Sequence, residues 1–255
     1  MPEVTFSVHQ FTYRPEFIEV GTIYYYIKSN IDGSYPARIF IYVRDPDHLE
    51  VLKFEEHGID AALVNAHMDW ETFSADQLES WVLTPDGGRR WQALLSSSFE
   101  DQTFTISWQE RKDIIPVGHY PTHIYNFDFI SLNYILRHWE DPEGEVTIGI
   151  LQPDFDPNPE TMMKYEGIVL IKYVGSEARN GQSCRKYNIG GEGLKNNNGV
   201  MWVNVEKGII EDIEIPIPDN LDWENFKFKF VSSEYMDPRQ WTEFMDAEIM
   251  RLKTK

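Results

Sequence analysis

Two histidines four residues apart form one candidate for chemistry. His119 and His123 lie in the segment VGHYPTHIYNFDF. On a helix this spacing would point both imidazoles at one metal ion, but Pro121 is incompatible with a helix interior and no glutamate follows the first histidine. We therefore expect no metal site here. The pair remains a candidate for acid–base catalysis, with Tyr120 beside it as a candidate ligand-binding residue. The alternative is two ordinary loop histidines.

A second pair lies on a predicted strand. In the segment from Ala61 to Trp70, alternation places His67 and Asp69 on the same face. A histidine and a carboxylate two residues apart can act as general acid and base, or can orient one another. A strand face that points to water has the same composition, so the sequence leaves both interpretations open.

Neighbouring predicted strands carry aromatic and charged side chains that we expect on one face of a sheet. These candidate ligand-binding residues are Tyr24, Tyr26, Arg38, Tyr42, Lys53 and Glu55. In a curled sheet they would converge on the inside, where rings mixed with fixed charges suit a polar or amphipathic small molecule. In a flat sheet they would face water, as charged residues mostly do.

The elements that must position these residues are mostly strands. Alternating segments separated by turn signals predict one strand meander over residues 1–125 and a second over residues 145–235. Residues 126–140, centred on Asp128 to Trp139, predict a helix that is apolar around most of its girth and capped by Asn126 or Asp128. Residues 237–253 predict a C-terminal helix opened by Pro238.

These elements predict an all-β fold, or a β-rich α+β fold, in a single domain over residues 1–255. An apolar helix has to be covered, and a meander of this length curls. We therefore expect a large curved antiparallel sheet or incomplete barrel around the central helix, with the C-terminal helix docked on the sheet.

The order of features over residues 128–216 resembles a family of uncharacterised bacterial envelope domains whose sheet is similar to the lipoprotein-carrier (LolA-like) fold. The segments that carry this resemblance are ISLNYILRHWEDPEGEVTIGI, EGIVLIKYVGSE, QSCRKYNI and GVMWVNVEKGIIEDIEIPI. The resemblance implies a strongly curved antiparallel sheet wrapped around a helix, with an apolar cleft between them. It transfers no catalytic residues.

Composition excludes several classes of partner. The formal net charge of −19 argues against nucleic acid, because binding to phosphates requires clustered lysine and arginine. No apolar run reaches the roughly 18 residues of a membrane helix, so we expect no membrane insertion. The N-terminus lacks the pattern of a signal peptide and Cys184 is the single cysteine, which favours the cytoplasm. The glycine-rich segment from Gly190 to Gly199 lacks nucleotide-binding spacing, and we expect no cofactor.

The function that these patterns favour is binding of a small amphipathic or apolar ligand in the curved sheet. One alternative is an enzyme, namely an isomerase, cyclase or hydrolase, that uses His67 and Asp69 or His119 and His123 in the same cavity. The other is a protein-interaction module, which an exposed apolar patch without a pocket would indicate.

Overall fold

The computed structural model describes residues 5–55, 61–84, 86–154, 156, 159–218 and 223–252. Within these residues, fifteen strands form one sheet in the order β11-β12-β13-β14-β15-β16-β17-β2-β3-β4-β5-β6-β7-β8-β9. Every neighbouring pair in that sheet is antiparallel except β11 and β12, which are parallel. The first strand, β1 (Thr5–Phe6), pairs in parallel with β10 (His119–Tyr120) outside it.

The strands of the large sheet follow the alternating segments of the sequence. In chain order they are β2 (Thr22–Ser29), β3 (Ala37–Asp45), β4 (His48–Glu55), β5 (Ala61–Asp69), β6 (Ser74–Leu83), β7 (Arg89–Ser98), β8 (Thr103–Trp108), β9 (Arg111–Pro116), β11 (Thr122–Ile124), β12 (Glu145–Pro153), β13 (Met163–Arg179), β14 (Gln182–Gly190), β15 (Asn198–Asn204), β16 (Ile210–Ile215) and β17 (Phe226–Tyr235). The predicted β-rich fold is confirmed. The sequence patterns did not predict β1, β9, β10 or β11.

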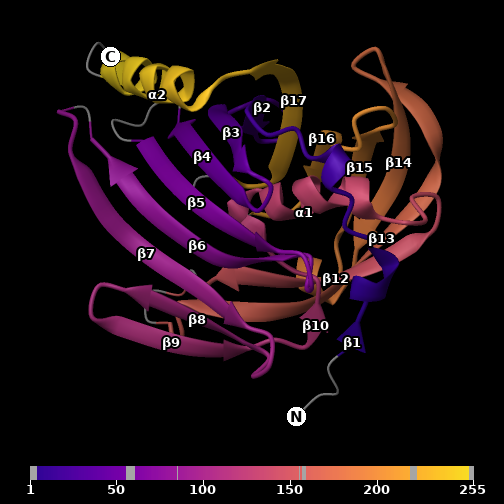
Figure 1. Ribbon diagram of the computed structural model, residues 1–255. Coiled ribbons are helices and arrows are strands. Elements are labelled where there is room, and N and C mark those ends of the chain that lie inside the picture. The colour runs from indigo at the N-terminus through magenta and orange to yellow at the C-terminus, as the bar shows by residue number, and fades with distance from the viewer. Residues whose placement is uncertain are drawn as a thin grey trace.

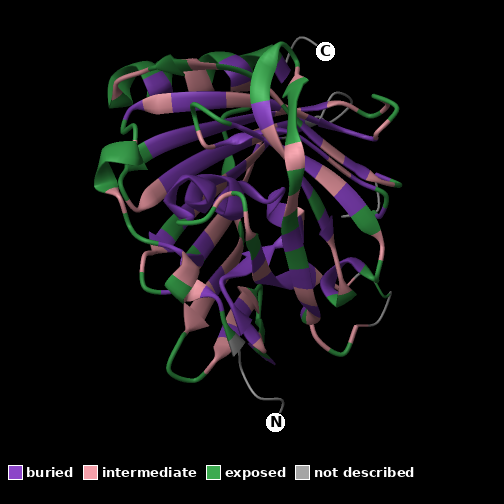
Figure 2. Cartoon of the chain, turned by 90° about the vertical axis from the view of Figure 1, so that its right-hand side faces the viewer, coloured by how far each residue is buried: buried purple, intermediate pink, exposed green. Residues whose placement is uncertain are grey.

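A short buried helix lies at the centre of the fold. The helix α1 (Ile130–Ile135) continues into the single turn Leu136–His138, and all of these residues are buried. Figure 1 shows the helix between the two halves of the sheet, and Figure 2 shows it as part of a buried interior with exposed residues gathered outside. The predicted central helix is therefore confirmed, and it is buried as its apolar surface requires.

The helix is shorter than the predicted range 126–140. Asp128 and Phe129 have φ angles of +56° and +54°, a left-handed conformation that interrupts helical geometry. Phe129 stands at the start of α1, and no side chain caps the helix. The expected caps are thus wrong: the carboxylate of Asp128 contacts two lysines instead.

An apolar cluster packs on each face of the sheet. The concave face packs on α1, with Ile39, Ile41 and Leu132 in one apolar cluster. The convex face of β2–β6 packs under the C-terminal helix α2 (Pro238–Leu252), whose Trp241 belongs to a second cluster with Leu52 and other outward-facing residues. The predicted C-terminal helix is confirmed on that outer face.

The two ends of the sheet are brought towards each other without pairing as strands. Asp113 of β9 accepts a hydrogen bond from the backbone N–H of Met162, at 2.8 Å. Arg111 of β9 donates to the carbonyl of Glu160, at 2.5 Å. The sheet is therefore an open one that curves strongly enough to approach an incomplete barrel (Figure 1).

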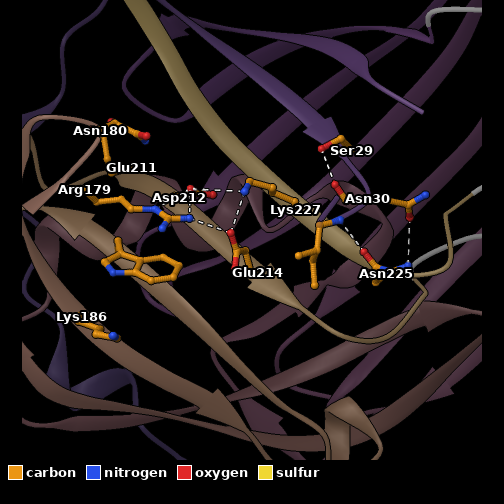
Figure 3. Close-up of polar contacts among 12 residues, drawn as sticks. Ser29, Asn30, Arg179, Asn180, Lys186, Glu211, Asp212, Glu214, Asn225 and Lys227 are labelled. Carbon is orange, nitrogen blue, oxygen red and sulfur yellow. Dashed lines mark hydrogen bonds and ion pairs between the residues drawn. The ribbon is translucent and has the colours of Figure 1, made fainter. Parts of the chain in front are cut away.

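The outer face of the other half of the sheet carries an ion-pair network (Figure 3). Arg179 lies 2.7 Å from both Asp212 and Glu214, and Lys227 lies 2.7 Å from Glu214. The Arg179 guanidinium also lies 4.1 Å from the ring centroid of Trp202. These opposite charges join β13 to β16, which are not adjacent in the sheet, and β16 to its neighbour β17, so they link three strands on the outer surface.

Candidate functional site

The structure divides the predicted aromatic and charged face between two sides of the sheet. Tyr24 pairs with Ile41 and Tyr26 pairs with Ile39, so both tyrosines share the concave face with those isoleucines. Arg38 and its alternating neighbours therefore face outwards. The expectation of one shared face is wrong. Its physical reason is that α2 covers the convex side, so both faces of β2–β4 are buried and alternation no longer distinguishes inside from outside.

The two concave tyrosines attach the central helix to the sheet. The hydroxyl of Tyr26 donates to the carbonyl of Ile210, at 3.0 Å, and accepts from the amide of Asn133 at the same distance. The hydroxyl of Tyr24 donates to Glu19, at 2.7 Å. Burial raises the pKa of both phenols. Neither side chain lines the cavity described below.

The outward-facing members lie beneath α2. Arg38 forms an ion pair with Glu248, at 2.6 Å, and the ring of Tyr42 stacks on Trp241 with 5.0 Å between centroids. The backbone of Glu55 pairs with β3, but its side chain lies outside the described residues. In this arrangement Arg38 and Tyr42 hold the helix on the sheet.

His67 and Asp69 do not act on each other. The imidazole of His67 lies 2.8 Å from Asp76 and 3.1 Å from Asp47, on the convex side. Burial alone would lower the pKa of His67, but these two carboxylates raise it above its ordinary value. Asp69, the last residue of β5, accepts hydrogen bonds from the backbone of Glu71 and the hydroxyl of Thr72, and so stabilises the turn that follows the strand.

His119 and His123 are buried in separate surroundings. Nε2 of His119 lies 3.0 Å from the carbonyl of Thr147, and Nδ1 of His123 lies 2.9 Å from the hydroxyl of Ser131. Burial lowers the pKa of His119 and lowers that of His123 to about 3. Both imidazoles are therefore neutral at neutral pH. Across the described residues, no group of three or more histidine, cysteine or acidic side chains is arranged to hold a metal ion.

Tyr120, between these histidines, belongs to an aromatic cluster. The centroid of its ring lies 5.1 Å from the ring centroid of Phe99 and 6.3 Å from that of Phe6. Burial raises the pKa of its phenol to about 12. The residue is buried and does not line the cavity.

An open cavity of about 950 Å³ lies on the concave side of the sheet. Residues of β2–β9 form one wall. The opposite wall consists of Ile124 and Phe127, from the segment before α1, and of Met162 and Met163, beside the β12–β13 connection. The segment before α1 therefore forms part of the cavity wall, whereas no residue of α1 itself lines the cavity. The sequence patterns did not single out this wall.

The sheet wall of the cavity is graded in polarity. Cross-strand pairing places Lys53, Ala62, Val82 and Arg90 in one row, which we call the mouth row because Arg90 at its end is exposed. Four residues along β6 from Val82 and five along β7 from Arg90, Leu78 and Leu95 are cross-strand partners, and Ile106 of β8 pairs with Leu95. These three buried residues form a second row, the inner row. The wall therefore changes from basic at the mouth to apolar inside.

A buried carboxylate joins the cavity wall to two lysines. Asp128 is fully buried; its carboxylate lies 2.9 Å from Nζ of Lys28 and accepts a hydrogen bond from Lys53. Burial by itself raises the pKa of Asp128, but the two ammonium groups outweigh that effect and hold the pKa below its ordinary value of 3.8. All three residues line the cavity. The left-handed backbone at Asp128 directs the chain so that this contact forms.

The cavity is basic although the protein is acidic. Of the described residues that line it, the charged ones are Lys28, Lys53, Arg90 and Arg111 against Asp128 and Asp154. The whole chain has a formal net charge of −19. Of the predicted ligand-binding residues, Lys53 lies in this wall and Tyr24, Tyr26, Arg38, Tyr42 and Tyr120 do not.

Arg90 is a cavity residue that sequence reasoning missed. The signal was the pair Arg89-Arg90 on a strand, because adjacent strand residues point to opposite faces and one of the two must face inwards. Asp128 carried no comparable signal, since its partner Lys53 lies 75 residues away in the sequence.

Comparison with known proteins gives a likeness of fold. No protein-family model matches the chain, and no curated protein matches it. Among solved structures, the chain is similar to the crystal structure of a "putative outer membrane lipoprotein-sorting protein domain" from Vibrio parahaemolyticus. The sequences are 11% identical, the match covers 90% of this chain and 91% of the other, and the TM-score is 0.33.

The helices do not provide a membrane span. Among the described residues, neither α1 nor α2 combines the length and the apolar character that crossing a bilayer requires.

Proposed function

We propose that the protein binds one small apolar or amphipathic molecule in the cavity on the concave side of the sheet. The observation that carries this proposal is the graded wall, with an apolar inner row facing Phe127 and Met162 across a volume of about 950 Å³. Ligand pockets in proteins run to roughly 300–1,000 Å³ and are lined mainly by apolar side chains with a few placed polar groups. This cavity has both properties.

The driving force in this proposal is removal of apolar surface from water. Leu95 and Ile106 line the cavity from the sheet, and Met162 and Met163 line it from the other side. Each ligand methylene placed between them contributes up to about 0.8 kcal/mol. Affinity is therefore expected to rise with the length of an aliphatic chain until the cavity is filled.

The residues predicted to serve an enzyme lie away from the cavity. None of His67, Asp69, His119 and His123 lines the cavity, so the acid–base groups proposed for an enzyme do not meet a ligand there. A cavity of this size on the concave face also favours a small-molecule binder over an interaction module, whose expected mark was an apolar patch without a pocket.

A substitution that fills the cavity tests the proposal. Ala93 of β7 is half-buried and lines the wall, so the Ala93→Phe variant places a ring where the ligand is expected. We expect it to weaken binding of the neutral fluorophore phenylnaphthylamine by about tenfold or more, equivalent to about 1.4 kcal/mol. The measurement is the increase in fluorescence on titration. The thermal unfolding midpoint of the variant should stay within a few degrees of the wild type.

The matched control is Ala178→Phe, because Ala178 is exposed on β13, away from the cavity. This variant should bind the fluorophore as the wild type does. Equal binding by the wild type and by both variants would show that the fluorophore does not use this cavity, and absence of binding to the wild type would contradict the proposed function itself.

A further inference from the structure

The mouth row has a basic residue at each end. Lys53 pairs with Ala62, Ala62 with Val82, and Val82 with Arg90, so the four side chains lie side by side on the concave face. Three strand spacings of about 4.8 Å separate the two basic positions by roughly 14 Å along the sheet. Two apolar side chains stand between them. The row therefore presents two cationic groups that flank the path to the inner row.

Lys53 has donor capacity beyond its contacts within the protein. Its ammonium group donates to the carboxylate of Asp128 and lies 3.4 Å from the carbonyl of Asn126. An ammonium group has three donors. The side chain is 19% exposed and lines the cavity. Among the described residues, these two acceptors leave a third donor of Lys53 for an acceptor that enters the cavity.

Arg90 and its surroundings provide the second cationic position. Arg90 is exposed on β7 and lines the cavity, as does the exposed Arg111 of β9. A guanidinium group presents donors in a planar fork that matches carboxylate and phosphate oxygens. Trp108, which pairs with Arg111, adds an aromatic surface at the same side of the cavity.

The distribution of charge in the protein favours an anion at the mouth row. Basic groups outnumber acidic ones in the described lining of the cavity, whereas acidic residues predominate in the chain as a whole. A cleft with apolar walls concentrates the field of the charges that line it. An anion is therefore favoured at the mouth row, while the remaining surface repels it.

We propose that the ligand is a single-chain amphiphile with an anionic head group, which Lys53 and Arg90 bind at the mouth row while its aliphatic chain lies against the inner row. This inference rests on the proposed function and adds the chemical class of the ligand. A carboxylate and a phosphate monoester share the required chemistry, namely negatively charged oxygens that accept hydrogen bonds.

Competition between matched amphiphiles tests the head group. Lauric acid, lauryl phosphate, lauryl alcohol and lauryl trimethylammonium share one aliphatic chain. Each is titrated against bound phenylnaphthylamine below its micelle concentration, at mildly alkaline pH where the acid is ionised. We expect both anions to bind about tenfold more tightly than the alcohol, because hydrogen bonds to charged groups are stronger than neutral ones. The cation should bind most weakly. The better of the two anions identifies the source of the head group.

Two variants locate the interaction. Arg90→Gln and Lys53→Met should each reduce the affinity for the anions several-fold and leave the affinity for lauryl alcohol unchanged. The alcohol reports that the cavity is intact, which matters for Lys53 because it also contacts Asp128. The control is Arg89→Gln: Arg89 lies on the opposite face, with its guanidinium 5.6 Å from the ring centroid of Trp81. It should change neither affinity.

The outcomes separate the two proposals. If neither the alcohol nor the anions displace the fluorophore, the proposed function fails. If the alcohol and the anions bind the wild type equally well, or if both variants weaken all the ligands alike, the cavity binds apolar chains and the anionic head group is wrong.

Discussion

The Asp128→Asn variant is expected to lose about 3–5 kcal/mol of unfolding free energy, the usual cost of removing one partner from a buried ion pair. Asp128 is fully buried, and the side chain of Lys28 is 4% exposed, so water cannot replace the contact with Lys28 without rearrangement. Asparagine has the size of aspartate and tolerates the left-handed backbone at this position. The loss therefore reports the charge. Urea denaturation at neutral pH measures it.

The contact between Asp128 and its two lysines also predicts how the difference in unfolding free energy between wild type and Asp128→Asn depends on pH. A carboxyl whose folded-state pKa is lowered contributes stability above its unfolded pKa and loses it as pH falls through the folded value. For Asp128 that loss lies below the ordinary pKa of 3.8. The difference in unfolding free energy between the wild type and Asp128→Asn should therefore decrease as the pH falls below 3.8. Asp246→Asn, at an exposed position on α2, is the control and should change stability by less than about 0.5 kcal/mol. A loss below about 1 kcal/mol for Asp128→Asn would contradict the buried ion pair.

Shortening a buried side chain of the central helix should also lower the unfolding free energy. Leu132 is fully buried within the curve of the sheet, so Leu132→Ala is expected to lower the unfolding free energy by roughly 2–5 kcal/mol. Ile114→Ala is the matched control, because Ile114 on β9 is 61% exposed and should contribute less than about 1 kcal/mol. Chemical denaturation compares the two. Equal small losses would place α1 outside the core and contradict the wrapped architecture.

The sequence predicted the strands well because most of them alternate clearly. Phe226 and Phe228 of β17 point into the core while Lys227 points outwards, as the pattern indicated. The strand β9 was missed because its first residues, Arg111 to Asp113, are charged and carry no apolar alternation. The strand pairs locally with β8, and it also contacts the β12–β13 connection, which is remote in the sequence.

The candidate site was predicted only in part, for two physical reasons. Alternation tells which residues share a face of one strand, but the pairing between strands decides which faces coincide, and Tyr26 pairs with Ile39 rather than with Arg38. The second reason is that the burial of a charged side chain can be predicted only when its oppositely charged partner is known. The sequence left open whether Lys53 faces a cavity or water, and the carboxylate of Asp128 that lies against it comes from a segment remote in the sequence.

An aliphatic ligand is expected to contact the inner row, and methyl NMR spectroscopy tests this contact most directly. Lauryl alcohol is added to protein whose leucine and isoleucine methyl groups are isotopically labelled, and intermolecular nuclear Overhauser effects are recorded. The cavity predicts effects to the methyl groups of Leu78, Leu95 and Ile106. Effects confined to Leu52 and Leu63, in the core beneath α2, would place the ligand on the convex side and contradict the account.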